Sequence, residues 1–312
     1  MPRQDSIMGA ASRRGWWGVR RLGLAVAVGV GVTLVASGVA VASPGNGASE
    51  FAPGHGGTPP GHGGTPPGHA TIGQFDKLPA PPLDGAELAA DQAKQTEANA
   101  YVARKALART GGVLSRSLGV PLYQQPNYYS CGPTTLAMIT TYLGVGYPGT
   151  VAQQVAAASY DLGTTTAGTA WYGADNVPSY PKGSWYPMQD ALNWRLYNAG
   201  RATWYLVHAL PGSPTDSDAS WYMYGLQFDT DDSWPIAANQ YSILNYQIGG
   251  QPNQTIQHWW ATYGYDNYGW TTKFNDPAPW PVATQRSAPS WDATAAHQHT
   301  VVEALGGRGY IW

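Results

Sequence analysis

Residues 120–144 read VPLYQQPNYYSCGPTTLAMITTYLG, and this stretch decides the fold. Its second half predicts a helix from Cys131 to Leu143, because Pro133 suits a first turn and apolar residues recur at helical spacing. Gly144 suits the position just after a helix. Cys131 is the only cysteine, and the positive end of a helix dipole favours a thiolate there. We therefore expect a reactive thiol, with a buried, inert cysteine as the alternative.

The chain opens with a basic leader followed by an uncharged run. Five arginines lie within residues 3–21, residues 22–42 carry no charge, and this run leads into Ala-Val-Ala-Ser at its end. We interpret residues 1–42 as a signal peptide cleaved after Ala42. The protein is then secreted, extracellular or associated with the cell envelope, with no membrane partner after cleavage. A retained anchor is the alternative, because the run is long enough to span a bilayer.

The amino-acid composition indicates an exported protein that does not bind nucleic acid. Only 12% of the 312 residues are charged, while Trp (14) and Tyr (20) are frequent. Cytosolic domains carry about a quarter charged residues, so this composition suits an exported protein. The leader holds five of the 17 basic and one of the 19 acidic residues, so residues 43–312 carry a net charge of −6. With no basic run left, we expect no nucleic-acid partner.

Residues 43–83 form the next region. They are rich in Gly and Pro, and the unit GHGGTPP occurs twice in succession. Such a segment buries too little apolar surface to offset its chain entropy, so it is predicted to be a disordered spacer. His55, His62 and His69 recur every seven residues within it. A metal-binding tract is one interpretation, but we favour a polar linker with incidental histidines.

Two regions complete the chain. Residues 84–112 are Ala-rich and predict a helix ending at Gly111-Gly112, which suits a propeptide, a packing helix or a stalk. Residues 113–312 place helices before β-prone runs, which predicts an α+β domain with an antiparallel sheet. The predicted helices are 131–143, 151–159, 187–197 and a short one near 295–305; the β-prone runs are 204–210, 235–244, 258–265 and 270–274. An acidic, aromatic insertion at 211–233 is expected to shape or cover the cleft.

A cysteine nucleophile needs a base, an orienting group and oxyanion donors. His258 opens the most strand-like segment, and Asp276 ends the next one, 18 residues on. A hairpin would bring this carboxylate near the imidazole, which could then face the thiol with its other nitrogen. Gln125, six residues before Cys131, could complete an oxyanion hole with the Cys131 N–H. Asp266, on the turn, is a rival orienting group.

Other candidate groups carry weaker signals. His297 and His299 flank a single residue, but no third ligand of matching context follows, so surface histidines are favoured over a metal pair. We therefore expect no metal and no cofactor. The many aromatic residues, Trp259 and Trp260 among them, are expected to pack in the core and rim, with a sugar- or peptide-binding platform as the alternative.

The core Tyr-Tyr-Ser-Cys-Gly-Pro with Gln125, the strand His-Trp-Trp-Ala-Thr-Tyr-Gly-Tyr-Asp and the turn Asn-Asp-Pro resemble the papain-like cysteine peptidases. More narrowly, they resemble secreted, stand-alone relatives of the bacteriocin-leader-processing peptidases, cysteine peptidase family thirty-nine. The resemblance covers about 113–312 and implies a papain-like fold, in which a helix carrying the nucleophile packs on an antiparallel sheet. It also implies Cys131 as nucleophile, His258 as base, Asp276 as orienting group and Gln125 as oxyanion donor.

This resemblance implies a secreted cysteine peptidase acting on peptides or proteins, including cell-wall peptides. The family's best-known members are fused to transporter domains and remove leader peptides. This chain shows no transporter sequence, so that substrate does not carry over. Two alternatives stay open: a non-catalytic binding module of the cell envelope, and an amidase or acyl-transfer enzyme acting on cell-wall peptides.

Overall fold

The computed structural model describes residues 83, 85–107, 115–173, 186–242, 248, 250–292 and 299–312. The helices are α2 (Gly85–Leu107), α3 (Cys131–Tyr142), α4 (Val151–Asp161), α5 (Pro187–Asn198), α6 (Asp216–Asp231) and α7 (Val301–Ala304). The strands are β1 (Arg116–Ser117), β2 (Val207–Ala209), β3 (Ile236–Ser242), β4 (Ile256–Asp266), β5 (Thr271–Asp276), β6 (Thr284–Pro289) and β7 (Gly309–Ile311). The predicted signal peptide, the predicted spacer apart from Leu83, Gly111-Gly112 and His297 lie outside the described residues.

The strands form one seven-stranded sheet in the order β2-β7-β3-β4-β5-β6, with β1 paired to β4. Every pairing is antiparallel. The predicted α+β fold is therefore confirmed. The hairpin predicted between the third and fourth β-prone runs is β4–β5, and the 3-10 turn η1 (Asn267–Gly269) closes it.

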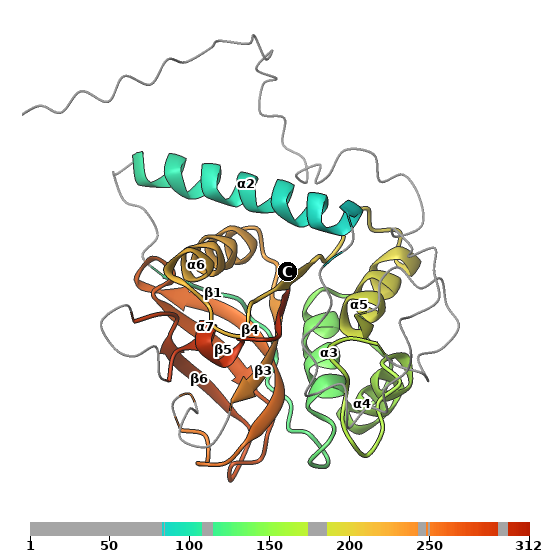
Figure 1. The fold of residues 1–312 in the computed structure, drawn as a ribbon. Coiled ribbons are helices and arrows are strands. Elements are labelled where there is room, and N and C mark those ends of the chain that lie inside the picture. The colour runs from blue at the N-terminus through green and yellow to red at the C-terminus, as the bar shows by residue number, and fades with distance from the viewer. Residues whose placement is uncertain are drawn as a thin grey trace, which may run out of the picture. The chain divides into compact units, whose positions relative to one another are not determined.

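The sheet has helices on both faces (Figure 1). Adjacent residues of a strand point to opposite faces, and the tryptophan pair of β4 shows the consequence. Trp259 belongs to the hydrophobic cluster that contains the α3 residues Leu136 and Ile139. Trp260 belongs to a second cluster, which contains Leu226 of α6. These tryptophans are 1% and 0% exposed, so the predicted core packing is confirmed for both.

Helix α3 begins at Cys131, as predicted, and nearly all of it is buried. It packs on α4, β4 and α5. Gly144 follows the helix with φ of +71°, a left-handed conformation that glycine adopts without strain. The helix therefore ends where the sequence predicted, because Gly144 takes up the left-handed conformation after it. This burial fixes the orientation of the first turn, where Cys131 lies.

The acidic, aromatic segment 211–233, which was expected to shape or cover the cleft, lies away from it. It forms α6, whose N-cap Thr215 accepts from the Asp218 N–H while the Asp218 carboxylate accepts from the Thr215 N–H. This reciprocal capping stabilises a helix start. Helix α6 packs against α2 and β4, and none of its residues lines the cleft described below. The expectation that this segment covers the cleft is therefore wrong for the described residues.

Helix α2 packs on the domain through buried polar contacts. Asp91 is 4% exposed. One of its carboxylate oxygens accepts a hydrogen bond from Trp312 Nε1 at 2.9 Å, and the other lies 2.9 Å from His208 Nδ1. Lys94 pairs with Asp229 at 3.0 Å. Burial raises the pKa of Asp229 to about 6, although the Lys94 charge counteracts the shift. Residues 85–107 therefore form a packing helix in this structure, and none of them lines the cleft.

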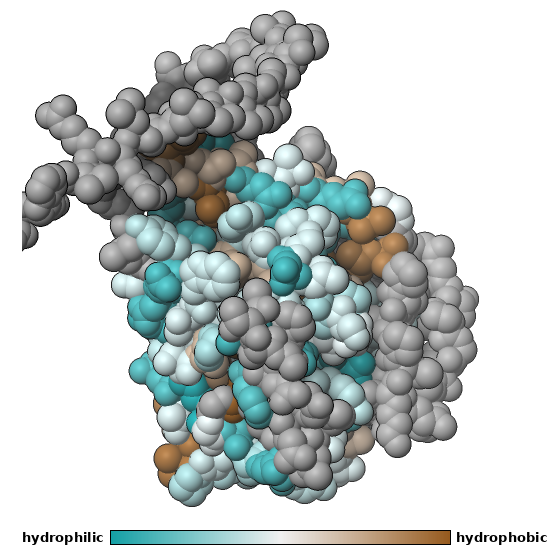
Figure 2. All heavy atoms as spheres, turned by 60° about the vertical axis from the view of Figure 1, so that its left-hand side comes forward, coloured by the Kyte–Doolittle hydropathy of each residue, from teal (hydrophilic) through white to brown (hydrophobic). Residues whose placement is uncertain are grey.

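The outer surface of the sheet side is mostly polar. On the face shown in Figure 2, hydrophobic residues lie in small separate groups among pale and hydrophilic ones. Within the described ranges, no helix is long and apolar enough to cross a membrane. The same residues contain no cluster of three or more His, Cys, Asp or Glu side chains that could hold a metal ion.

Candidate active site

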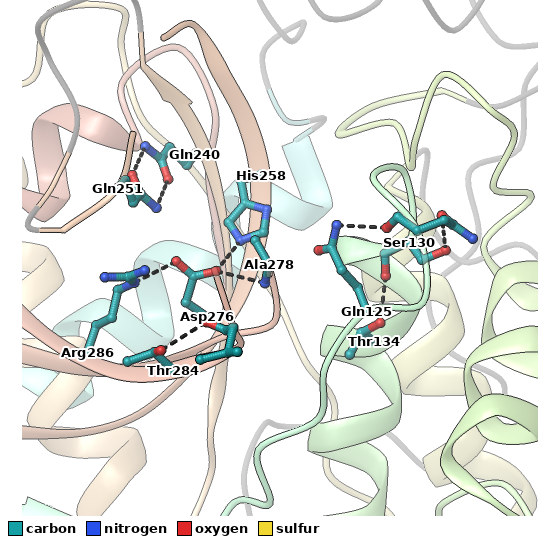
Figure 3. A network of polar contacts seen from close by, with 12 residues as sticks. Gln125, Ser130, Thr134, Gln240, Gln251, His258, Asp276, Ala278, Thr284 and Arg286 are labelled. Carbon is teal, nitrogen blue, oxygen red and sulfur yellow. Dashed lines mark hydrogen bonds and ion pairs between the residues drawn. The ribbon is translucent and has the colours of Figure 1, made fainter. Parts of the chain in front are cut away.

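The β4–β5 hairpin brings His258 to Asp276. The His258 Nε2 atom lies 2.8 Å from Asp276 Oδ1, and the two side chains are 3% and 0% exposed. The Ala278 N–H donates to the same oxygen at 3.0 Å, and Arg286 Nε donates to Oδ2 at 2.8 Å. Figure 3 shows the carboxylate held between the imidazole and the guanidinium. Asp276 is therefore fixed by donors on both of its oxygens.

Electrostatics favour the charged forms of this pair. Burial alone would lower the pKa of His258, but the negative charge of Asp276 and their hydrogen bond outweigh it and, with Cys131, raise it to about 10. Burial alone would raise the pKa of Asp276, but the His258 charge, the Ala278 N–H and Arg286 bring it to about 2. An imidazolium–carboxylate pair is thus the stable form at neutral pH.

Cys131 is the third residue of this arrangement and lies at the start of α3, which packs against β4. Its interaction with the imidazole helps to raise the pKa of His258, and Cys131 is 6% exposed at the first position of α3. Because Asp276 occupies Nε2, Nδ1 is the ring nitrogen available to the thiol. The structure therefore brings together the three residues that the sequence singled out, from α3, β4 and the end of β5.

The loop before α3 is held by Asn127, which the sequence analysis did not single out. Its side-chain oxygen accepts from the Ser130 hydroxyl at 2.6 Å and from the Tyr129 N–H at 3.2 Å. Ser130 is the N-cap of α3 but caps no N–H with its side chain. The Cys131 N–H, among the first of the helix, thus lacks an intrahelical acceptor. An Asn followed closely by Ser in a turn is the signal that could have indicated this contact.

Gln125 lies beside this loop and is 5% exposed. Its Nε2 donates to the Asn127 carbonyl at 2.8 Å, and its backbone N–H donates to the Pro277 carbonyl next to Asp276. The Asn127 carbonyl fixes the orientation of the amide, because the opposite orientation would place two acceptors against each other. An amide nitrogen carries two hydrogens, so one remains available as a donor.

Gly132 allows α3 to approach the loop that carries Thr169. A Cβ on Gly132 would overlap the Thr169 side chain, whose Cβ would lie 2.6 Å away. The main-chain oxygen of Thr169 in turn accepts from Trp259 Nε1 at 3.2 Å. The residue after the nucleophile candidate is therefore a glycine for a steric reason.

Gly132→Ala is expected to destabilise the fold by about 1–3 kcal/mol, the usual cost of overpacking a buried site. It should also lower the reactivity of Cys131, because relief of the overlap displaces the first turn of α3. Chemical denaturation and the rate of thiol alkylation measure the two effects. Gly119→Ala is the matched control, since its Cβ would meet nothing within 4 Å; equal stability of the two variants would contradict the prediction.

A cleft of about 740 Å³ has both His258 and Gln125 among its lining residues. One wall is residues 124–128, and the other contains residues 250–252, 254–258, Pro279 and Trp280. The Trp280 ring lies 5.7 Å from the His258 ring, so it covers one side of the imidazole. No Asp, Glu, Lys or Arg is among the described lining residues.

The remaining candidates lie elsewhere. Asp266, the rival orienting group, is at the far end of β4 from His258 and pairs with Lys273 at 2.7 Å. His208 contacts Asp91 of α2. His299 has φ of +71° and belongs to no metal-binding cluster in the described part of the chain. Arg286, Asn127 and Trp280 are the site residues that the sequence analysis missed.

The sequence profile of the Peptidase_C39 like family matches residues 117–299. The crystal structure of a candidate C39-like peptidase from Bacillus anthracis is 15% identical, and the match covers 63% of this chain and 96% of that one with a TM-score of 0.33. A TM-score this low says nothing about function. No curated protein matches the chain.

Proposed function

Because the chain belongs to the Peptidase_C39 like family, we propose that it is an exported cysteine peptidase hydrolysing peptide or amide bonds. Cys131 is the nucleophile, His258 the base, Asp276 the orienting group and Gln125 an oxyanion donor. The observation that supports the proposal most is the buried imidazole of His258, which lies 2.8 Å from Asp276 and whose pKa is raised by Asp276 and by Cys131. A nucleophile, a base and an orienting group within hydrogen-bond reach are the signature of such catalysis.

The proposed reaction begins with the Cys131 sulfur attacking the carbonyl carbon. A carbon–sulfur bond forms, and the carbonyl π electrons move to oxygen. The Cys131 N–H and the second Gln125 amide hydrogen donate to this oxyanion. His258, which carries a proton at neutral pH, donates it to the leaving amine as the carbon–nitrogen bond breaks. The neutral imidazole then deprotonates a water, whose attack cleaves the thioester, releases the Cys131 sulfur and leaves His258 protonated again.

The reactivity of Cys131 tests this assignment. Iodoacetamide is expected to alkylate Cys131 in the folded protein near neutral pH, and His258→Ala is expected to slow the alkylation. The physical reason is that the imidazole accepts the thiol proton. Mass spectrometry of the native protein over time gives the rates. The assignment fails if the thiol reacts only after denaturation.

Among the described lining residues of the cleft, the charge of His258 is balanced by Asp276 and no other charged side chain is present, which predicts a preference for uncharged substrate residues. A charged side chain next to the scissile bond would be buried without a counter-charge, and an unpaired buried polar group costs about 1–3 kcal/mol. We expect kcat/KM to fall by about tenfold when a neutral residue there is replaced by Lys or Glu. Digestion of a peptide library with single substitutions measures this, and equal cleavage of charged and neutral members would contradict it.

A further inference from the structure

Arg286 extends the site beyond the proposed triad. It comes from β6, the edge strand next to β5, and its Nε reaches Asp276 Oδ2 at 2.8 Å. Its side chain is 10% exposed, whereas that of Asp276 is fully buried. Among the described residues, it is the donor to this second oxygen, while His258 and the Ala278 N–H both use the first. Arg286 therefore fixes the rotation of the carboxylate.

The same guanidinium supports a wall of the cleft. Gly250 lies in the cleft wall with φ of +80°, and a Cβ on it would overlap Arg286 Nη1. The next residue, Gln251, forms two amide–amide hydrogen bonds with Gln240, at 2.8 and 2.9 Å. Gln240 is the residue of β3 that pairs in register with His258. Figure 3 shows Arg286 and this glutamine pair on the side of Asp276 and His258 away from Gln125.

We infer that Arg286 is a positioning residue: it holds the Asp276 carboxylate in the orientation that fixes the His258 ring, and it braces the cleft wall at Gly250. This role rests on the proposed function of the triad. It explains a feature that the triad alone leaves open, namely how a fully buried carboxylate keeps one orientation. A cation placed against the free oxygen also prevents the carboxylate from rotating away from the imidazole.

The titration of His258 separates positioning from simple charge. Among the described residues, the charged or titratable groups that act on His258 and Asp276 are Cys131 on α3, Arg286 on β6 and each other. If Arg286 acted only through its charge, its removal would raise the pKa of His258, because the imidazolium would no longer be repelled by a nearby cation and would have the charge of Asp276 to itself. Loss of the carboxylate's orientation would lower this pKa, because the hydrogen bond to Nε2 weakens. The two roles thus predict shifts of opposite sign.

The experiment is an NMR titration of the full chain labelled with ¹⁵N-histidine, with the His258 signal identified by its loss in His258→Asn. The wild-type pKa is about 10. Arg286→Met is expected to lower it by about one unit or more. Arg286→Lys keeps the charge without the Nε donor and is expected to lower it by less. Lys273→Met, which removes a cation from β5 that pairs with Asp266, is the matched control.

A second pair of variants tests the contact at Gly250. Gly250→Ala is expected to lower the His258 pKa in the same direction, because the added Cβ displaces the guanidinium. Gly200→Ala is the control, since Gly200 also has a positive φ, of +69°, but its Cβ would meet nothing within 4 Å. It carries the same backbone strain without the displacement and should leave the titration unchanged.

An unchanged or raised His258 pKa in Arg286→Met overturns the inference. If that variant fails to fold, Arg286→Lys decides by the same criterion, and a wild-type pKa in it overturns the inference as well. The titration requires no turnover. If Arg286→Met lowers the His258 pKa but the wild type hydrolyses no peptide, the positioning role holds and the peptidase assignment fails. If the wild type is active but Arg286→Met leaves the His258 pKa unchanged, the peptidase assignment holds and the positioning role fails.

Discussion

Cys131→Ala is expected to lower kcat by about 10⁴-fold or more, because no other side chain of the described site can form the covalent intermediate. A loss of this size corresponds to about 5 kcal/mol of transition-state stabilisation. Binding of a peptide substrate should change little, since the residues that line the cleft are untouched. Hydrolysis assays measure the first effect, and calorimetric titration with an uncleaved peptide measures the second.

Thr135→Ala is a matched control for this variant. Thr135 lies one turn further along α3, and its buried hydroxyl has no hydrogen-bond partner. Its removal therefore costs no hydrogen bond and should leave kcat close to the wild-type value. Comparable activity of Cys131→Ala and the wild type would refute covalent catalysis at this residue. Binding to cell-envelope material that survives in Cys131→Ala, with no hydrolysis by the wild type, would favour a binding module.

Asp276→Ala is expected to reduce both activity and stability. It leaves His258 and Arg286 without their shared carboxylate, and breaking a buried ion pair costs about 3–5 kcal/mol. The catalytic loss should be of the order of 10⁴-fold, since an unoriented imidazole serves poorly as a base. Denaturant unfolding and peptide hydrolysis measure the two effects. Asp266→Ala removes an exposed partner of Lys273, so it should cost about 0–1 kcal/mol and spare activity.

The ion pair between His258 and Asp276 also makes the stability of the fold depend on pH. The pKa of Asp276 is lowered from 3.8 to about 2, so its stabilising effect is present above pH 3.8 and is lost as the pH falls towards 2. The pKa of His258 is raised from 6.5 to about 10, so its effect is complete below pH 6.5 and is lost as the pH rises towards 10. In Asp276→Ala, the free energy of unfolding should no longer fall between pH 3.8 and about 2. If the variant loses as much stability as the wild type over this range, the ion pair is contradicted.

Local signals predicted the parts of the site that depend on local structure. The start of α3 at Cys131 followed from Pro133 and helical spacing, and its end followed from Gly144. The approach of Asp276 to His258 followed from two β-prone runs joined by a turn, because an antiparallel hairpin brings the end of one strand back to the start of the other. These inferences needed no long-range information beyond one hairpin.

Parts that depend on tertiary packing were not predictable in this way. Strand β6, which carries Arg286, reads Thr-Gln-Arg-Ser-Ala-Pro and lacks a β-branched alternating pattern. Its register against β5 places Arg286 opposite Phe274, and only this register brings its guanidinium to Asp276. Helix α6 was missed because it buries polar residues such as Gln227, Asp229 and Thr230 between α2 and the sheet, so its sequence lacks a clear apolar stripe at helical spacing. The Thr215 and Asp218 spacing was its one local signal.

Trapping the covalent intermediate tests most directly whether Cys131 attacks the substrate. The wild type is mixed with a cleavable peptide, quenched in acid during turnover, digested and analysed by mass spectrometry. The account predicts that the peptide containing Cys131 gains the mass of the acyl half of the substrate, and that the adduct is absent from Cys131→Ala. Steady hydrolysis with Cys131 unmodified at every time point, and persisting in Cys131→Ala, would contradict it.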